Sequence, residues 1–148
     1  MYQHILVPLA FDEHDRDPAG PLAAARALSG PDTRVTLMHV MEEAPPFALS
    51  YMPPGYQDEL CEAIEALLDK HAAGFPRGDG VLIEGNAGRS IVEWAEENDV
   101  DCIVIASHRA GFRGILMGST AVQVVRHAPC SVHLMRGQDH LASTPAAD

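Results

Sequence analysis

The sequence predicts one α/β domain, in which helices cover both faces of an open, five-stranded parallel β-sheet. Short apolar runs alternate along the chain with segments of helical periodicity, as in β-α-β units with right-handed crossovers. The runs are mainly apolar and do not alternate strictly with polar residues, which is typical of strands buried on both faces. The chain has 148 residues, of which 47% are hydrophobic, so a single domain with a substantial core is expected.

The five predicted strands are short, and a helical segment lies in each connection between them. Their bounds are Ile5–Leu9, Arg34–Val40, Val81–Glu84, Val100–Ala106 and Val132–Met135. The turn sequence Gly30-Pro31-Asp32 precedes the second strand and separates it from the first helix.

The predicted helices are Gly20–Leu28, Gln57–Ala73, Ser90–Glu97 and Ser119–His127. Pro21 lies in the first turn of the first helix, where proline is tolerated. Periodicity places four apolar residues on one face of the second helix: Leu60, Ile64, Leu67 and Leu68. The third helix has Ile91, Trp94 and Ala95 as its apolar side, and Ala128-Pro129 ends the fourth.

Two segments are expected to lack regular structure. Residues 41–56 contain four prolines, which interrupt both helices and strands. The residues from Gly137 onwards are small and polar, so 137–148 are expected to be a disordered tail. The predicted domain therefore spans residues 1–136.

The composition excludes several classes of function. A net charge of -11 is the opposite of what nucleic-acid binding requires. No apolar segment approaches the roughly 20 residues that span a bilayer. The three cysteines are widely spaced, so neither a zinc site nor a redox motif is indicated. Their odd number and the lack of a signal peptide are typical of a protein in the reducing cytoplasm.

A glycine-rich, basic loop connects the fourth strand to the last helix, with the sequence "ASHRAGFRGILMGS". In an open parallel sheet, ligands lie beyond the carboxyl ends of the strands. The unpaired N–H groups and the dipole at a helix start favour an anion. Gly118 allows a close approach of the backbone, and Ser119 and Thr120 add hydroxyls. Gly111 permits a bend, and Arg109 adds a charge-assisted hydrogen bond. These features predict a phosphate-binding loop.

A structural interpretation of the same loop stays open. Glycine-rich loops before helices are common, and Ser119 could serve only as the N-cap of its helix. The loop is not a Walker A motif, because Gly118 stands where that motif has lysine. It is not a dinucleotide fingerprint either, because no G-x-G-x-x-G sequence follows the first strand.

Other chemistry-bearing residues are predicted to be structural. His39 ends the second strand, and His127 suits the C-terminus of the last helix. Cys102 lies inside a buried strand and is interpreted as a packing residue. No nucleophile, base and orienting group are recognisable together.

Several segments of the chain resemble the universal stress protein family. They read "ILVPLA", "VTLMHV", "EGNAGRSIVEWA", "DCIVIASHR" and "GSTAVQVVRHAPCSVHLMR". Nucleotide-binding members of that family show G-x-x-G, nine residues and G-[ST], followed by a helix and an ending like "RHAPCPVLVVR". The chain matches this ending and has Gly118-Ser119. It is similar in particular to a subgroup with a shorter A-S-H-R loop.

The resemblance implies a Rossmann-like, adenine nucleotide alpha hydrolase-like sheet with strand order 3-2-1-4-5. It also implies homodimers paired through the last strand, Val132–Met135, and tetramers built from them. In many members ATP binds between strands one and four. The expected cofactor is therefore ATP, AMP or ADP, accompanied by Mg²⁺ or Mn²⁺.

Carried over by position, Pro8, Ala10 and Val40 would lie beside the adenine and ribose. The segment Ala106, Ser107, His108 and Arg109 would flank the ribose and the phosphates. The residues that would hold the phosphates are Gly118, Ser119 and Thr120.

The chain departs from the family pattern at three points. The first two motif glycines are Ala106 and Arg109 here, and eight residues separate Arg109 from Gly118. The aspartate that contacts the nucleoside in the family is Ala10. Loss of that hydrogen bond would weaken binding by roughly 1.5–3 kcal/mol, or about ten- to a hundredfold.

Three functions remain in competition. The resemblance favours a cytoplasmic, nucleotide-binding regulatory dimer in the stress response. The alternatives are a nucleotide-free dimeric adaptor and a slow ATP hydrolase. An enzymatic role is the less favoured, because neither a positioned water nor a metal site is evident in the sequence.

Overall fold

We describe a computed structural model of the chain. It describes residues 1–11, 18–43, 45–107 and 118–136. The expected disordered tail lies outside the described residues, as do the predicted site residues His108, Arg109 and Gly111.

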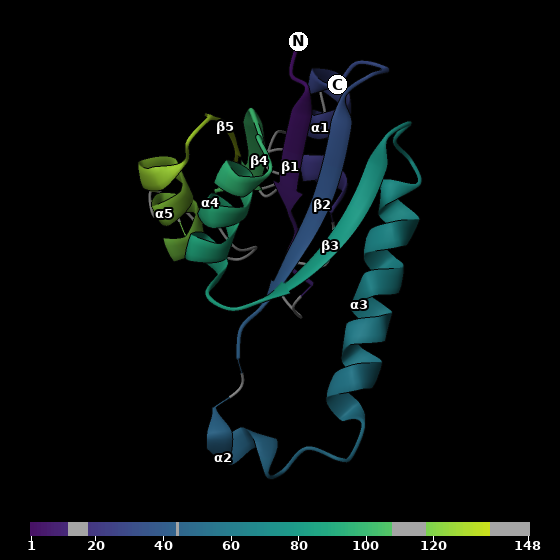
Figure 1. The fold of residues 1–148 in the computed structure, drawn as a ribbon, viewed down its shortest axis with the longest axis vertical. Coiled ribbons are helices and arrows are strands. Elements are labelled where there is room, and N and C mark those ends of the chain that lie inside the picture. Colours follow the sequence, from purple (N-terminus) through teal and green to yellow (C-terminus); the bar gives the residue numbers. More distant parts are fainter. Residues whose placement is uncertain (12–17, 44, 108–117, 137–148) are drawn as a thin grey trace, which may run out of the picture.

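Five parallel strands form one sheet in the order β3-β2-β1-β4-β5 (Figure 1), which confirms the predicted fold class. The strands are β1 (His4–Pro8), β2 (Arg34–Met41), β3 (Gly78–Glu84), β4 (Cys102–Ala106) and β5 (Ser131–Met135). Each lies within a few residues of its predicted position, and β1 is central, so both of its faces are buried.

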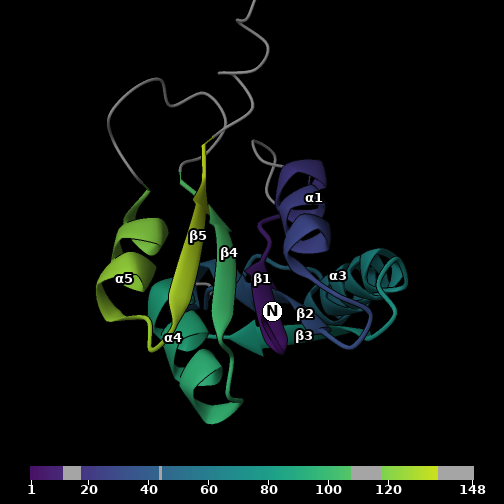
Figure 2. The same cartoon turned by 90° about the horizontal axis from the view of Figure 1, so that it is seen from above.

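Helices pack on both faces of the sheet (Figure 2). Their bounds are α1 (Ala19–Leu28), α2 (Pro46–Leu49), α3 (Tyr56–Ala72), α4 (Ala87–Glu97) and α5 (Ser119–His127). Buried residues of α1 and α3 belong to one core cluster, and those of α4 and α5 belong to the other. No helix among the described residues has both the length and the apolar character needed to cross a bilayer.

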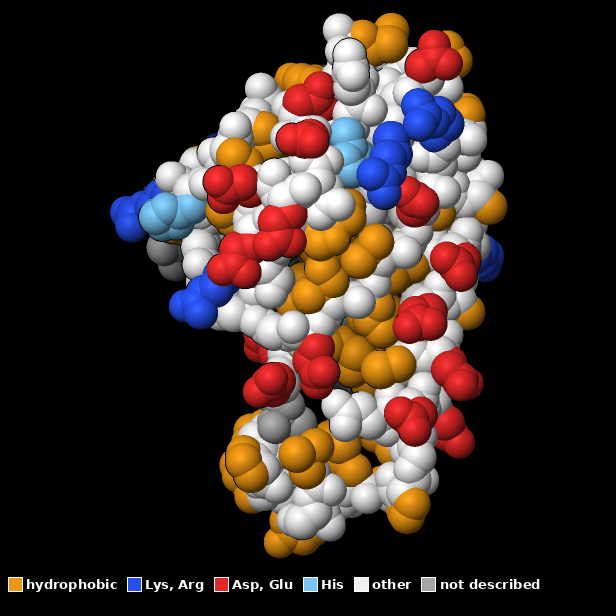
Figure 3. All heavy atoms as spheres, viewed as in Figure 1, with side chains coloured by type: hydrophobic (Ala, Val, Ile, Leu, Met, Phe, Trp, Pro, Cys, Tyr) orange, Lys and Arg blue, Asp and Glu red, His pale blue; other side chains and the backbone are white. Residues whose placement is uncertain are grey.

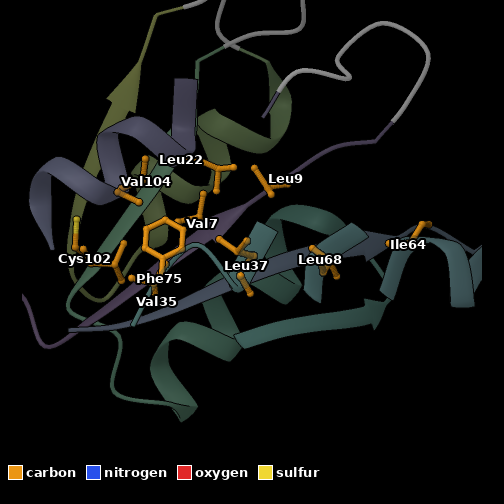
Figure 4. Packing of buried hydrophobic residues seen from close by; sticks show 13 residues of the cluster. Val7, Leu9, Leu22, Val35, Leu37, Ile64, Leu68, Phe75, Cys102 and Val104 are labelled. Atoms are coloured by element: carbon orange, nitrogen blue, oxygen red, sulfur yellow. The ribbon is translucent and has the colours of Figure 1, made fainter. Parts of the chain in front are cut away.

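Alternate residues of the central strands build the two clusters. Val7 of β1 and Leu37 of β2 point towards Leu22 of α1 and Phe75 (Figure 4). Their neighbours Leu6 and Met38 point to the opposite face and pack with α4 and α5. This alternation between two covered faces explains why the strands read as continuous apolar runs.

The structure corrects several boundaries. β3 begins at Gly78, earlier than predicted, because its glycines let α3 lie close to the backbone. A Cβ atom at Gly78 would collide with the carbonyl group of Ala72, and one at Gly80 would lie 2.7 Å from Leu68 Cβ. The short helix α2 lies within the segment that was expected to be irregular.

The predicted buried face of α3 was partly wrong. Ile64 and Leu68 are buried, whereas Leu60 and Leu67 are 38% and 39% exposed. The buried stripe instead continues from Ile64 and Leu68 to Ala72.

Candidate functional site

The direction of the chain crossovers reverses between β1 and β4. The chain leaves β1 for β2 on one side and leaves β4 for β5 on the other. Such a switch point opens a crevice at the carboxyl ends of the two strands, which is where open α/β sheets bind ligands. Pro8, Ala106 and the first turn of α5 lie at this edge of the sheet.

Two backbone hydrogen bonds fix the end of β4 against its neighbours. The Ser107 N–H donates to the Met135 carbonyl at 2.7 Å, and the Gly118 N–H donates to the Ser107 carbonyl at 2.8 Å. The start of α5 is therefore joined directly to the end of β4. Sequence reasoning missed this role of Ser107, because a bond between two backbone groups leaves no side-chain signal.

The first turn of α5 has no side-chain cap among the described residues. Gly118 is the N-cap, and its carbonyl accepts the Val122 N–H at 3.0 Å. The interpretation of Ser119 as the N-cap is wrong, because Ser119 is the first residue of the helix itself and is exposed. Ser119, Thr120 and Ala121 form the first turn of α5, whose N–H groups have no acceptor within the helix and are the groups with which a helix start can bind an anion.

The neighbouring helix α4 begins differently, although its first turn lies at the same edge of the sheet. Asn86 is its N-cap, and the Asn86 side-chain oxygen accepts the Arg89 N–H at 3.1 Å. Helices α1 and α3 also begin without a side-chain cap, so among the described helices α4 is the exception, and α5 differs from the others in lying beside the switch point of the sheet.

The ends of β1 and β2 form the rest of the candidate site. Pro8 and Val40 are partly buried, and Ala10 is exposed. The Leu9 N–H donates to the Met38 carbonyl at 2.7 Å, and the His39 ring Nδ1–H donates to the Leu9 carbonyl at 2.7 Å. His39 is thus structural, as predicted, and it holds the chain that carries Ala10.

Cys102 and Cys130 lie at the amino ends of β4 and β5, at the opposite end of the sheet from the candidate site. Burial raises the pKa of the Cys130 thiol to about 11 and also raises the pKa of Cys102. Both groups are protonated at neutral pH and therefore unreactive. Cys102 is 1% exposed, which agrees with its predicted packing role.

No group of three His, Cys, Asp or Glu residues in the described parts of the chain could hold a metal ion. A divalent cation at this edge would therefore depend chiefly on ligand phosphates and on residues outside those parts.

The chain matches the model of the universal stress protein family over residues 1–136. It is 30% identical to the universal stress protein of Methanothermobacter thermautotrophicus, over 92% of this chain and 97% of that protein.

Two solved structures share the fold. Universal stress protein UspA from Lactobacillus plantarum has a TM-score of 0.68 and 21% identity, covering 91% of this chain and 98% of that one. The Arabidopsis thaliana universal stress protein At3g01520 was solved with AMP bound. It has a TM-score of 0.63 and 15% identity, and the match covers 99% of each chain. With the family model matched over nearly its whole length, the chain belongs to the universal stress protein family.

Proposed function

We propose that the chain binds an adenine nucleotide in the crevice between β1 and β4, with the phosphates at the start of α5. The position of the first turn of α5 carries this proposal. The helix begins next to the end of β4, to which the Gly118 N–H is bonded, and beside a switch point of the sheet. A nucleotide in the same fold is seen in the Arabidopsis protein with AMP bound.

Each part of the nucleotide has a proposed contact. The phosphate oxygens accept the N–H groups of α5 and the hydroxyls of Ser119 and Thr120. The partly buried Pro8 and Val40 lie beside the base and the ribose, and Ala106 and Ser107 flank the ribose. The remaining predicted phosphate contacts, His108, Arg109 and Gly111, lie outside the described residues.

The preferred ligand is ATP, with AMP and ADP as weaker alternatives and with Mg²⁺ or Mn²⁺ bound to the phosphates. A triphosphate offers the most oxygens to a site whose donors are backbone amides and arginine. Because Ala10 has no carboxylate for the ribose, the affinity should fall below that of relatives with aspartate there, by about ten- to a hundredfold.

Calorimetric titration with ATP and Mg²⁺ tests this proposal. It should show one site per chain, and the supernatant of heat-denatured protein should absorb at 260 nm if nucleotide is retained during purification. Neither heat of binding nor retained nucleotide would favour the nucleotide-free adaptor. Phosphate release under excess ATP tests hydrolysis, and a rate no higher than that of a buffer blank would exclude it.

We further propose that the protein is a homodimer paired through β5 and acts as a cytoplasmic regulator in the stress response. Among the described strands, β5 contacts only β4, and Val132 and Leu134 on it are partly exposed. An uncovered apolar edge strand promotes association. Sedimentation of a Val132→Lys variant should give monomers where the wild type gives dimers or tetramers.

A further inference from the structure

The β2–β3 side of the molecule carries two exposed apolar surfaces that the proposed nucleotide site does not use. The first, the β3 face, consists of Val81 and Ile83, which are only partly buried on the α4 side of the sheet. The second, the arm, consists of residues 45–56, which include α2 and join β2 to α3. The arm projects beyond the carboxyl ends of the strands (Figure 1), and Figure 3 shows apolar side chains on both surfaces in one view.

The β3 face is wide and long enough to accommodate one further helix. Helices pack about 10 Å apart and strands about 4.8 Å apart, so two helices cover about four strands. On this side α4 and α5 pack on the other strands, and Figure 1 shows no helix in front of β3. The seven residues of β3 span about 23 Å, which equals about 15 residues of helix.

The arm exposes an unusual share of the aromatic residues. The chain has four Phe, three Tyr and one Trp. Three of these side chains lie on the arm, where Phe47 is 72%, Tyr51 86% and Tyr56 46% exposed. The arm has no charged residue between Glu43 and Asp58. Aromatic side chains dominate the centres of protein interfaces, so their exposure here indicates a binding surface.

Carboxylates border these apolar surfaces on both sides (Figure 3). On α3, exposed Asp58, Glu62, Glu65 and Asp69 recur at helical spacing and share one face. Asp69 approaches β3 from the α3 side of the sheet, since a Cβ atom at Gly80 would lie 3.2 Å from Asp69 Oδ1, and Figure 3 shows carboxylates along this edge of the apolar surface. On the other side, the exposed carboxylates are Glu42 and Glu43 after β2 and Glu93 on α4.

The net charge of the chain and the carboxylates around the two surfaces determine which kind of partner can bind there. A second copy of this chain, with a net charge of -11, would bring like charges together across the interface. The C-terminal sequence "GQDHLASTPAAD" has neither an apolar run nor an excess of basic residues to match the rim. We propose that the β3 face and the arm together bind an amphipathic helix of another protein, with apolar residues on one side and Lys or Arg along its flanks.

A designed peptide serves as the probe. It has 18 residues, a Leu stripe at helical spacing and Lys and Arg on both flanks. A second peptide keeps the Leu stripe but has Glu in place of the basic residues. Fluorescence anisotropy should show that the full-length protein binds the basic peptide at least about tenfold more tightly than the acidic one. Equal affinities would overturn the proposal.

Variants locate the binding surface. Phe47→Ser/Tyr51→Ser removes exposed aromatic anchors, and Glu62→Gln/Glu65→Gln removes rim charge. Each should weaken binding of the basic peptide by about tenfold or more. The matched controls are Val125→Ser, a 48% exposed side chain on α5, and Asp32→Asn/Asp99→Asn, exposed carboxylates outside the rim. These controls should leave the affinity unchanged.

Two further outcomes would contradict the proposal. If the carboxylate control weakens binding as much as Glu62→Gln/Glu65→Gln, the peptide is held by net charge alone. If Phe47→Ser/Tyr51→Ser lowers the oligomeric state in sedimentation, the arm is covered by a second copy. Because this surface contains no proposed phosphate contact, the test stands or fails independently of nucleotide binding.

Discussion

The side of the sheet where the strands begin, the amino edge, differs from the side where they end, the carboxyl edge, in how its polar groups find hydrogen-bond partners. At the amino edge, Asp101 accepts the N–H groups of Gln3 and His4, each at 2.9 Å. The His4 ring donates from Nδ1 to the Asn98 carbonyl at 3.0 Å, and its Nε2 lies 2.8 Å from the Thr36 hydroxyl. At the carboxyl edge, the first N–H groups of α5 have no acceptor within the helix. The described polar groups of the amino edge are paired with one another, whereas the carboxyl edge carries the helix start that we propose binds a ligand.

The most severe test of this comparison is Gly118→Val. The Gly118 backbone has φ -59° and ψ 151°, which valine adopts without strain, so the variant should fold. Its side chain would occupy the space in front of the α5 amides. Calorimetry should show ATP affinity reduced about a hundredfold or more, equivalent to about 2.7 kcal/mol.

A Gly118→Val protein that melts normally and still binds ATP at wild-type affinity would refute the placement of the phosphates. Ser119→Ala is the milder companion variant. It removes one hydroxyl and leaves the backbone donors in place, so a smaller loss is expected.

Thr36→Val tests whether the amino edge really depends on its internal hydrogen bonds. Thr36 is fully buried, and valine has nearly its shape but leaves His4 Nε2 without a partner. The free energy of unfolding should fall by about 1–3 kcal/mol in urea denaturation. ATP affinity should not change, because the two edges lie at opposite ends of the strands. A neutral effect on stability would mean that water replaces the hydroxyl.

Stability should also depend on pH through His4. Burial lowers the pKa of His4 below its ordinary value of 6.5, and the hydrogen bond to the Asn98 carbonyl only partly opposes this effect. The unfolded chain then binds more protons than the folded chain at pH values between the two pKa values. The His4 contribution is therefore complete above about pH 6.5 and is lost as the pH falls below it.

Denaturation at a series of pH values checks this prediction against His4→Gln. The stability difference between wild type and variant should shrink below pH 6.5. A difference that stays constant between pH 8 and 5 would show that the proton on His4 is not linked to folding.

Asn86→Ala should have the smallest effect on stability. It leaves α4 without a side-chain cap, as in α5. It removes the acceptor for the Arg89 N–H, at an expected cost of about 1 kcal/mol in stability. Urea denaturation measures the cost, and Ser119→Ala is its control, because Ser119 does not cap α5. Equal losses in both variants would remove the distinction between the two helix starts.

The sequence predicted the sheet well, because burial on both faces produces continuous apolar runs at β1, β2 and β4. It missed the start of β3, since Gly78 and Gly80 read as a turn although they form the close contact with α3. The exposure of Leu60 and Leu67 could not be predicted either, because helical periodicity does not reveal how wide the buried face is.

Of the candidate site, the structure confirms the start of α5, and the binding roles of the residues stay predictions. The Gly118-Ser119 pair marked the correct helix start, but the choice between a capping serine and free donors needed backbone geometry. The residues brought to one edge, Pro8, Val40, Ala106 and Gly118, come from four separate elements. Their placement depends on strand order, which apolar patterns alone do not determine.

The hydrogen bond from the Gly118 N–H to the Ser107 carbonyl ties together both ends of the segment that connects β4 to α5. Its length can then change in evolution without moving the helix start. Even a doubling of such a segment adds only about 0.6 kcal/mol of closure entropy. One residue fewer than the family motif is therefore compatible with unaltered positions of the α5 amides, and length variation in this segment is free to tune selectivity between ligands.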